Sequence, residues 1–328
     1  MAKITILGSG GWGTALGITA FDSGHSVTLW SPFAEEVQML STLRTNEKLL
    51  KGVTIPEQID ITTDLSCVEG SDITIIATPS TAIRATAKRL KEFKNYGIVV
   101  NVSKGFEKDS LLRLSEVIES ELPDASIVAL SGPSHAEEVA RRIPTSLVAA
   151  SKDEAASIKV QELLSNQFLR IYTSNDIIGV ELGGALKNVI AICAGMCDGL
   201  GLGDNSKAAL ITRGLAEMAR LGVAMGADVL TLAGLAGIGD LVVTCTSQHS
   251  RNNRFGFKVG TGVDTKTALE EVGTVEGYYA ALMAHKLAIK HSVELPIIET
   301  CYNVLYENKS IDTVVADLML RPKRSEND

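Results

Sequence analysis

The chain begins Met1-Ala-Lys-Ile-Thr-Ile-Leu-Gly8-Ser-Gly10-Gly-Trp-Gly13-Thr14, an apolar run that leads directly into spaced glycines. Helical spacing of apolar residues follows, so the pattern predicts a β-strand, a tight turn and the N-terminus of an α-helix. Gly8 permits the turn, Gly10 lets a pyrophosphate approach the backbone, and Gly13 allows the helix to pack closely on the strand. Free N–H groups at a helix N-terminus attract anions. The stretch therefore predicts a dinucleotide site; the alternative is a glycine-rich turn without a ligand.

Length and composition indicate a protein of two domains with a large apolar core. The chain has 328 residues, of which 45% are hydrophobic. Its net charge of −8 argues against general nucleic-acid binding but allows a small phosphorylated substrate. Five cysteines, an odd number, indicate reduced thiols in the cytosol. The longest apolar runs are about half of the roughly 20 residues that a membrane span requires. We therefore expect a soluble, cytoplasmic protein without stable membrane insertion.

The second predicted strand, 25–30, bears on which dinucleotide is bound. An acidic residue about 20 positions beyond the glycines would bind the adenine ribose 2′-hydroxyl and repel a 2′-phosphate. The strand ends instead in Trp30-Ser31-Pro32, with no carboxylate at its tip, which favours NADP. The preference is weak, because no arginine replaces the carboxylate and Glu35 and Glu36 follow closely.

The periodicity of the chain changes near residue 175. Before it, predicted strands and helices alternate, with strands over 72–78, 97–103, 126–130, 144–151 and 168–173. After it, the pattern is helical almost throughout, including segments over 176–196, 207–225, 265–272, 275–289, 297–307 and 311–320. We therefore expect a doubly wound α/β domain over 1–175 and an all-helical domain over 176–328.

Two of the predicted strands end in residues that suit ligand binding. Lys104 follows the strand at 97–103, and Ser131-Gly132-Pro133-Ser134 follows the strand at 126–130. Ligands of open α/β sheets bind beyond the carboxyl ends of the strands. Topology thus places Lys104 near a cofactor or substrate, unless it is a solvated loop lysine. Ser134 with Glu137 has the spacing of a capping box.

Polar residues interrupt the apolar helix at Glu181-Leu-Gly-Gly-Ala-Leu-Lys187-Asn188. An unpaired ammonium is costly to bury, so a lysine in such a helix usually lines a polar cavity or has a partner. A desolvated lysine with a lowered pKa is a suitable general acid or base. The alternative for Lys187 is a surface position on the polar edge of the helix.

Further candidates lie in the second half of the chain. Asp240, after a glycine-rich apolar run, is either a helix N-cap or the partner of a catalytic lysine. Ser250-Arg251-Asn252 suits a phosphate, because an arginine can donate two parallel hydrogen bonds to it; the alternative is a solvated basic loop. The five histidines show no metal-ligand spacing, so we predict no metal site.

Taken together, these motifs make the chain similar to bacterial-type NAD(P)-dependent glycerol-3-phosphate dehydrogenases. The resemblance extends over nearly the whole chain and rests on Gly8–Ala15, Ser103–Phe106, Ser131–Pro133, Glu181–Asn188, Gly237–Leu241, Ser250–Asn252 and Val275–Gly277. It implies the same two-domain fold. It also implies that dihydroxyacetone phosphate is reduced to sn-glycerol 3-phosphate for glycerophospholipid synthesis.

The resemblance implies roles for individual residues. Lys187 is the general acid that protonates the ketone oxygen, Lys104 touches substrate and cofactor, and Asp240 orients the lysines and hydroxyls. The implied substrate-binding residues are Lys104, Gly132, Ser134, Lys187, Asn188, Asp240, Thr244, Ser250, Arg251 and Asn252. The implied cofactor-binding residues are Gly8, Gly10, Gly11, Trp12, Gly13, Pro32, Lys104, Ala136, Arg251, Thr274 and Glu276. Pro32 stands where the family often has a basic residue, so the NADP preference is the weakest of these expectations.

Two alternatives remain at the level of the sequence. One is another two-domain reductase, of the hydroxyacid or ketopantoate type, against which the phosphate-suited Ser250-Arg251-Asn252 argues. The other is a dinucleotide-binding regulator without turnover, which leaves Lys187 and Asp240 unexplained. The apolar content of the helical domain makes a homodimer plausible.

Overall fold

The computed structural model describes residues 1–108, 110–323 and 325–326, and the chain divides into two compact units. The first unit comprises Met1–Gly184 and Leu230–Asp240, and the second comprises Ala185–Val229 and Leu241–Asp328. The periodicity changes near residue 175 because the last strand ends at Ser174. The unit boundary falls later, because Ile177 and Val180, in the next helix, pack with sheet residues of the first unit.

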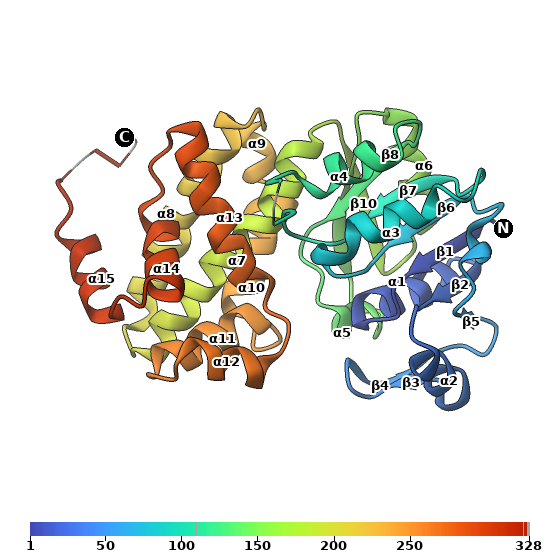
Figure 1. Ribbon diagram of the computed structural model, residues 1–328, viewed down its shortest axis with the longest axis horizontal. Coiled ribbons are helices and arrows are strands. Elements are labelled where there is room, and N and C mark those ends of the chain that lie inside the picture. Colours follow the sequence, from blue (N-terminus) through green and yellow to red (C-terminus); the bar gives the residue numbers. More distant parts are fainter. Residues whose placement is uncertain (109, 324, 327–328) are drawn as a thin grey trace. The chain divides into compact units, whose positions relative to one another are not determined.

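The first unit contains the strands and most of the short helices of the chain (Figure 1). Its strands are β1 (Lys3–Leu7), β2 (Ser26–Trp30), β3 (Thr45–Asn46), β4 (Leu50–Thr54), β5 (Asp60–Thr62), β6 (Ile73–Ile76), β7 (Ile98–Asn101), β8 (Ile127–Ser131), β9 (Thr145–Ala150) and β10 (Leu169–Ser174). Its helices are α1 (Gly11–Asp22), α2 (Ala34–Leu43), η1 (Leu65–Val68), η2 (Ser80–Ala82), α3 (Ile83–Leu90), α4 (Leu114–Glu121), α5 (Ala136–Val139) and α6 (Glu154–Leu164). The segment 230–240 adds most of α9 (Val229–Leu232) and the π-helical turn η3 (Leu235–Gly239).

The main sheet of the described residues has the strand order β10-β9-β8-β7-β6-β1-β2-β5. Neighbouring strands are parallel except β8 and β9, which pair antiparallel. The predicted strand and helix alternation is confirmed, whereas this reversal was not expected. The hairpin of β3 and β4 was not predicted either.

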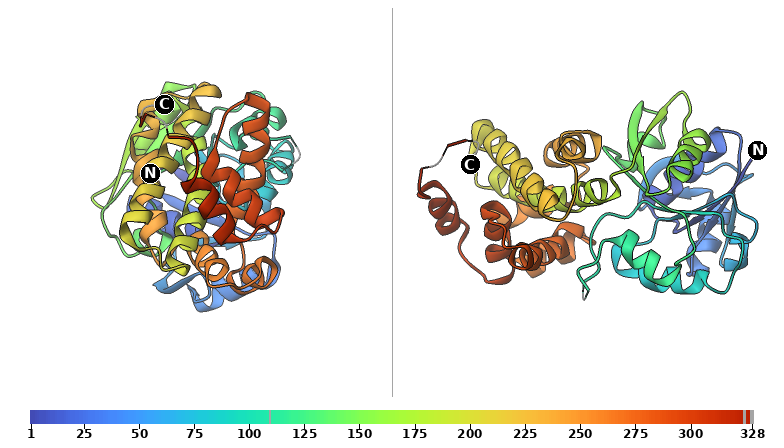
Figure 2. Two further views of the ribbon diagram at one scale, coloured as in Figure 1. Left: turned by 90° about the vertical axis from the view of Figure 1, so that its left-hand side faces the viewer. Right: turned by 90° about the horizontal axis from the view of Figure 1, so that it is seen from above.

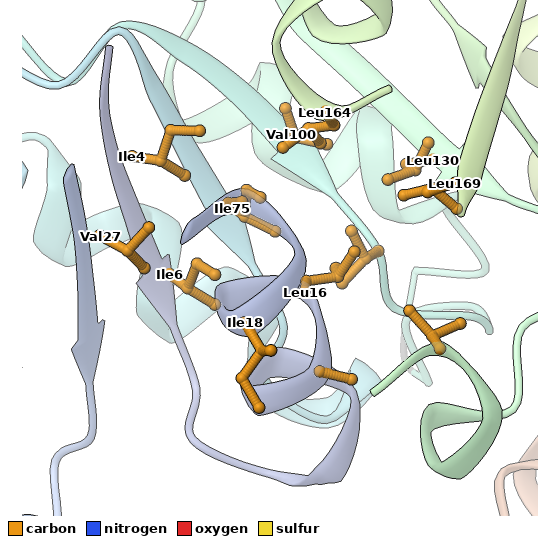
Figure 3. Packing of buried hydrophobic residues seen from close by; sticks show 14 of the residues in the cluster. Ile4, Ile6, Leu16, Ile18, Val27, Ile75, Val100, Leu130, Leu164 and Leu169 are labelled. Atoms are coloured by element: carbon orange, nitrogen blue, oxygen red, sulfur yellow. The ribbon is translucent and has the colours of Figure 1, made fainter. Parts of the chain in front are cut away.

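Alternation of side chains along the strands builds a separate core on each face of this sheet. Ile4, Ile6 and Ile75 belong to one cluster (Figure 3), whereas Leu7 and Ile76 belong to the other. The first cluster includes residues of α1 and α6, and the second includes residues of α3 and α4. Figure 2 shows helices on both sides of the sheet. Burial on both faces explains why the central strands are continuously apolar, and the predicted doubly wound domain is confirmed.

The second unit is helical throughout its described secondary structure. Its helices are most of α7 (Ile177–Gly199), then α8 (Gly203–Ala224), α10 (Asp240–Thr246, whose first residue belongs to the first unit), α11 (Arg251–Gly260), α12 (Thr265–Val272), α13 (Glu276–His291), α14 (Pro296–Tyr306) and α15 (Ile311–Met319). Every residue of α7 from Ala185 to Met196 is buried. Helix α14 packs against α8, α13 and α15.

Two segments are long and apolar enough to span a membrane, namely Ile177–Gly199 and Val229–Thr246. The apolar runs considered in the sequence are uninterrupted ones, whereas these segments reach this length with polar residues included. Single polar residues such as Glu181 and Lys187 divide the apolar run in the sequence without interrupting the helix. Most of Ile177–Gly199 is buried, as is typical of a core helix.

Candidate active site

The glycines after β1 adopt the geometry that a dinucleotide loop requires. Gly8 has φ +122°, and a Cβ on Gly13 would lie 2.0 Å from the carbonyl oxygen of Gly8. Gly10 has no heavy atom within 4 Å of its Cβ position, so the space over it is open. Helix α1 begins at Gly11, and its N-cap, Gly10, has no side chain to cover the first N–H groups. These groups are therefore available to an anion.

The end of β2 lies beside this loop, because the N–H of Gly8 donates to the carbonyl oxygen of Trp30 at 2.8 Å. The hydroxyl of the buried Ser31 donates to the Glu36 carboxylate at 2.5 Å. The strand tip, expected to lack a carboxylate, thus has one supplied by the first turn of α2. Glu36 was noted in the sequence as a close neighbour of the strand, but local spacing could not show its hydrogen bond to Ser31. Pro32 at the tip is exposed.

Other predicted cofactor residues lie on this side of the first unit. Trp12 and Ala136 are partly buried against the core cluster that contains Ile4. A Cβ on Gly11 would lie 2.7 Å from the carbonyl oxygen of Leu49, in the unpredicted hairpin. The backbone of Leu49 therefore leaves no space for a side chain at position 11.

Lys104 and Asp240 form an ion pair in the first unit. Lys104 follows β7, and its Nζ lies 2.7 Å from Asp240 Oδ2 and donates to the carbonyl oxygen of Gly132 at 3.0 Å. Asp240 is 1% exposed, whereas the side chain of Lys104 is 18% exposed. The predicted partnership of Asp240 with a lysine is confirmed, with Lys104 as the lysine.

The π-helical turn η3 immediately precedes Asp240 and positions it beside Lys104. A Cβ on Gly237 would lie 1.8 Å from the carbonyl oxygen of Leu232, so only glycine fits there. Asp240 then begins α10. The glycine-rich run thus serves close backbone packing against its own preceding turn.

Ser134 does not cap a helix. Helix α5 begins at Ala136 with His135 as its N-cap, so the expected capping box is wrong. The Ser134 hydroxyl instead donates to the carbonyl oxygen of Gly132 at 2.9 Å and lies 3.4 Å from Lys104 Nζ. The structure therefore brings Lys104, Gly132, Ser134 and Asp240 together.

Lys187 is buried in the second unit, with 6% of its surface exposed. Its Nζ donates to Thr244 Oγ1 of α10 at 2.7 Å. The alternative of a surface lysine is therefore wrong. A buried ammonium with a hydroxyl partner is placed to donate a proton to an acceptor that reaches it.

Asn252 joins three helices of the second unit. Its amide donates to Asn188 Oδ1 of α7 at 2.9 Å and its Oδ1 accepts from the N–H of Gly277 in α13 at 2.9 Å. Ser250 is the N-cap of α11, where its Oγ accepts from the N–H of Asn253. Arg251, the first residue of α11, is exposed. The segment Ser250-Arg251-Asn252 is therefore the N-terminus of a helix, and the alternative of a solvated basic loop is wrong.

Two further predicted residues, Thr274 and Glu276, lie close in sequence to Gly277, which Asn252 contacts. Thr274 is exposed, and Glu276 begins α13. Sequence reasoning missed Gly184, whose Cβ would lie 3.3 Å from Lys104 Cγ and 2.8 Å from Ser131 Oγ. The paired glycines before Lys187 were the available signal. Within the described residues, no group of three or more His, Cys, Asp or Glu side chains is placed to hold a metal ion.

Comparison with known proteins identifies the family. The model described as NAD-dependent glycerol-3-phosphate dehydrogenase N-terminus matches residues 3–157, and that of the C-terminus matches residues 176–316. A glycerol-3-phosphate dehydrogenase [NAD(P)+] of Bacillus velezensis is 49% identical over 99% of this chain and 96% of its own length.

Solved structures agree with this assignment. A glycerol-3-phosphate dehydrogenase from Coxiella burnetii has a TM-score of 0.94 and 39% identity, covering 98% of this chain and 99% of that one. A ketopantoate reductase from Ralstonia eutropha has a TM-score of 0.62 at 15% identity, covering 95% and 99%, which shows a shared fold alone. The chain therefore belongs to the NAD-dependent glycerol-3-phosphate dehydrogenase family of NAD(P)-dependent oxidoreductases that act on a CH–OH group.

Proposed function

We propose that the protein reduces dihydroxyacetone phosphate to sn-glycerol 3-phosphate with Lys187 as the general acid. The observation that carries the proposal is the burial of the Lys187 ammonium, with a donated hydrogen bond to Thr244. Hydride transfer to a carbonyl carbon leaves negative charge on the oxygen. A preorganised ammonium stabilises that charge as it develops and supplies the proton.

Lys104 and Asp240 act together in this proposal. The Asp240 carboxylate, bonded to Lys104 Nζ at 2.7 Å, holds that ammonium in one orientation. The Gly132 carbonyl oxygen and the Ser134 hydroxyl lie within 3.4 Å of the same nitrogen. These groups bind the polar end of the substrate, and Lys104 also touches the cofactor.

The phosphate of the substrate is held by Ser250, Arg251 and Asn252. These residues occupy the first turn of α11, where the helix dipole favours an anion, and Arg251 adds a positive charge that is exposed. Asn188 and Thr244 support the site through their bonds to Asn252 and Lys187. The phosphate lies away from the reacting carbon, so its binding energy positions that carbon for reaction.

The dinucleotide is held by the loop of Gly8, Gly10, Gly11, Trp12 and Gly13, with contributions from Pro32, Ala136, Thr274 and Glu276. The open space over Gly10 and the free N–H groups of α1 fit a pyrophosphate. When bound, the reduced nicotinamide supplies the hydride. Lys104 and Arg251 contribute positive charge to the cofactor as well as to the substrate.

The organisation of the molecule follows from these roles. Residues 1–175 form the dinucleotide-binding domain, and residues 176–328 form the substrate domain, although the first turns of α7 and the segment 230–240 pack with the first unit. The protein acts in the cytoplasm, without stable membrane insertion, and its product enters glycerophospholipid synthesis. Exposed apolar side chains of the second unit, including Val223, Ile289 and Met319, favour a homodimer.

The absorbance of the reduced nicotinamide tests the reaction. We expect rapid oxidation of NADPH or NADH with dihydroxyacetone phosphate and little with unphosphorylated dihydroxyacetone or with ketopantoate. Equal rates with the phosphorylated and unphosphorylated ketones would refute the phosphate role of the Ser250-Arg251-Asn252 group. Oxidation with ketopantoate alone would assign the chain to the other reductase class.

A further inference from the structure

A buried ion pair lies next to Lys104 in the first unit and has no part in the mechanism above. Glu181 of α7 and Arg113, at the start of α4, are both buried, with Arg113 Nη1 2.6 Å from Glu181 Oε2. Glu181 Oε1 accepts from the N–H of Ser115 at 2.8 Å, and Oε2 also accepts from the Ser115 hydroxyl. Burial raises the pKa of Glu181, against the opposing effects of Arg113 and Ser115.

Arg113 stands at the far end of the loop that begins with Lys104. Phe106 and Arg113 form an isolated antiparallel bridge, and the N–H of Glu107 donates to the carbonyl oxygen of Leu112 at 3.0 Å. Arg84 holds the same loop from α3, donating to both carboxylate oxygens of Glu107 at 2.6 and 2.7 Å. The Arg113–Glu181 pair therefore fixes one end of the loop to α7.

Lys104 lies against the same turn of α7. Gly184 follows Glu181 by three residues, which places both on one face of the helix. The Cγ of Lys104 lies 3.3 Å from where a Cβ on Gly184 would be. The turn that Glu181 anchors is thus the surface on which the aliphatic part of Lys104 rests.

Packing around Lys104 is incomplete. A small cavity beside it is lined by Asn101, Ser103, Ser131, Glu181 and Gly184. Within the described residues, the buried Ser131 hydroxyl in this lining has no hydrogen-bond partner. Asp240, Gly132 and Ser134 hold the ammonium of Lys104, so the position of its backbone and aliphatic part depends on what holds its loop.

We propose that the buried Arg113–Glu181 pair is a positioning device that holds Lys104 in its reactive place against Asp240. The proposal rests on the proposed role of Lys104 in the reaction. A role in stability alone is a poorer explanation, because buried ion pairs are often no more stabilising than apolar residues of the same volume. Arg113 and Glu181 are positioning residues and contact no substrate.

Glu181→Gln tests the proposal, since it removes the charge and keeps the shape. We expect kcat/KM for dihydroxyacetone phosphate to fall by up to about 100-fold, because small displacements of a catalytic group cost this much. NADPH affinity, measured by fluorescence titration, should change much less than kcat/KM, because the glycine loop that holds the pyrophosphate is untouched and Lys104 is only one of the groups proposed to contact the cofactor.

A double-mutant cycle with Lys104→Ala separates positioning from other effects. If Glu181 acts through Lys104, Glu181→Gln lowers kcat/KM in the wild-type background and has no further effect in the Lys104→Ala background. Additive losses in the two backgrounds would overturn the proposal. If Lys104→Ala leaves turnover unchanged, the proposed function of Lys104 fails instead, and the cycle distinguishes the two failures.

Two further variants control for stability. Glu217→Gln alters another buried carboxylate, on α8, which accepts from the N–H groups of Ile297 and Ile298. It should change the melting temperature at acid pH without lowering kcat/KM. The pair Arg113→Met with Glu181→Met removes both buried charges, so it should fold even if Glu181→Gln does not, and it should still lack full kcat. Full activity in the folded double variant would overturn the proposal.

Discussion

Among single residues, the Lys104–Asp240 pair has a structural role beside the functional role that we propose for it. Asp240 is almost completely buried, and the ammonium of Lys104 lies 2.7 Å from its carboxylate. Removing one partner of a buried ion pair costs more than removing both, because one charge remains buried without its counter-charge.

We predict that Lys104→Met lowers the free energy of unfolding by about 3 kcal/mol, near the lower end of the effect for buried pairs because Lys104 is partly exposed. The double variant Lys104→Met with Asp240→Asn should recover most of this loss. Urea unfolding of the two variants and the wild type measures both effects. Equal stability of wild type and Lys104→Met would show that Asp240 does not depend on Lys104.

The sequence identified the residues of this cluster more readily than their contacts. The strand ends placed Lys104 and the segment at Gly132 at one edge of the sheet, because the carboxyl ends of parallel strands lie together. Ser134 was assigned to a helix cap because local spacing cannot show that Lys104 competes for its hydroxyl. Arg113 was not singled out at all, since its partner Glu181 is 68 residues away.

Among the elements, the junction of β1 and α1 contains two glycines, Gly10 and Gly13, that we expect to respond differently to substitution. We predict that Gly10→Ala folds normally and weakens NADPH binding roughly tenfold, about 1.4 kcal/mol, because a methyl group meets only the approaching pyrophosphate. Gly13→Ala should destabilise the fold, because its Cβ would lie 2.0 Å from the carbonyl oxygen of Gly8.

Fluorescence titration with NADPH and thermal melting compare the two glycine variants. If Gly10→Ala binds NADPH as well as the wild type does, the pyrophosphate does not approach Gly10. If Gly13→Ala melts at the wild-type temperature, the close contact of helix and loop is not required.

The junction of β2 and α2 bears on the choice of cofactor. The Glu36 carboxylate, held by Ser31 at the strand tip, places negative charge where a 2′-phosphate would approach. We predict that Glu36→Gln raises the ratio of NADPH to NADH affinity, whereas the exposed neighbour variant Glu35→Gln changes it little. Titration of each variant with both cofactors measures the ratio. The same ratio in Glu36→Gln as in wild type would contradict a role for Glu36.

The contact between α8 and α14 should make stability depend on pH. Burial raises the pKa of Glu217 from 4.5 to about 7, although the N–H groups of Ile297 and Ile298 oppose the shift. Between these two pH values the folded chain binds the proton more tightly than the unfolded chain does. The contribution of Glu217 to stability is therefore full below pH 4.5 and is lost as the pH rises to about 7, by up to about 3 kcal/mol.

Glu217→Gln supplies the comparison for this pH effect. The difference in unfolding free energy between wild type and Glu217→Gln should decrease from acid to neutral pH and then stay constant. A difference that is independent of pH would show that Glu217 keeps its ordinary pKa in the folded protein.

The sequence predicted whether a segment forms a strand or a helix better than it predicted the direction in which each strand runs in the sheet. Apolar periodicity separated strands from helices, because strands buried on both faces are continuously apolar. It could not show that β9 runs antiparallel to β8, since direction leaves no mark in local spacing. The hairpin of β3 and β4 and the turn η3 were missed because their residues carry no regular period.

At the scale of the whole molecule, the order of the motifs identified the family that the family models and relatives confirm. Each motif alone is common, but their order along one chain is specific. The unit boundary was harder to place, because α7 is one continuous helix whose first turns pack on the sheet of the first unit. Periodicity marks where helices begin and carries no information on what they pack against.

In the proposed reaction, Lys187 supplies the proton for ketone reduction. Single-turnover oxidation of bound NADPH by saturating dihydroxyacetone phosphate tests it most directly in the wild type and in Lys187→Ala. We predict that the variant binds NADPH with unchanged affinity and reacts about 10²–10⁴ times more slowly, a loss of about 2.7–5.5 kcal/mol of transition-state stabilisation. A wild-type rate in Lys187→Ala would show that Lys187 is not the proton donor, and a loss of NADPH binding would show that Lys187 belongs to the cofactor site instead.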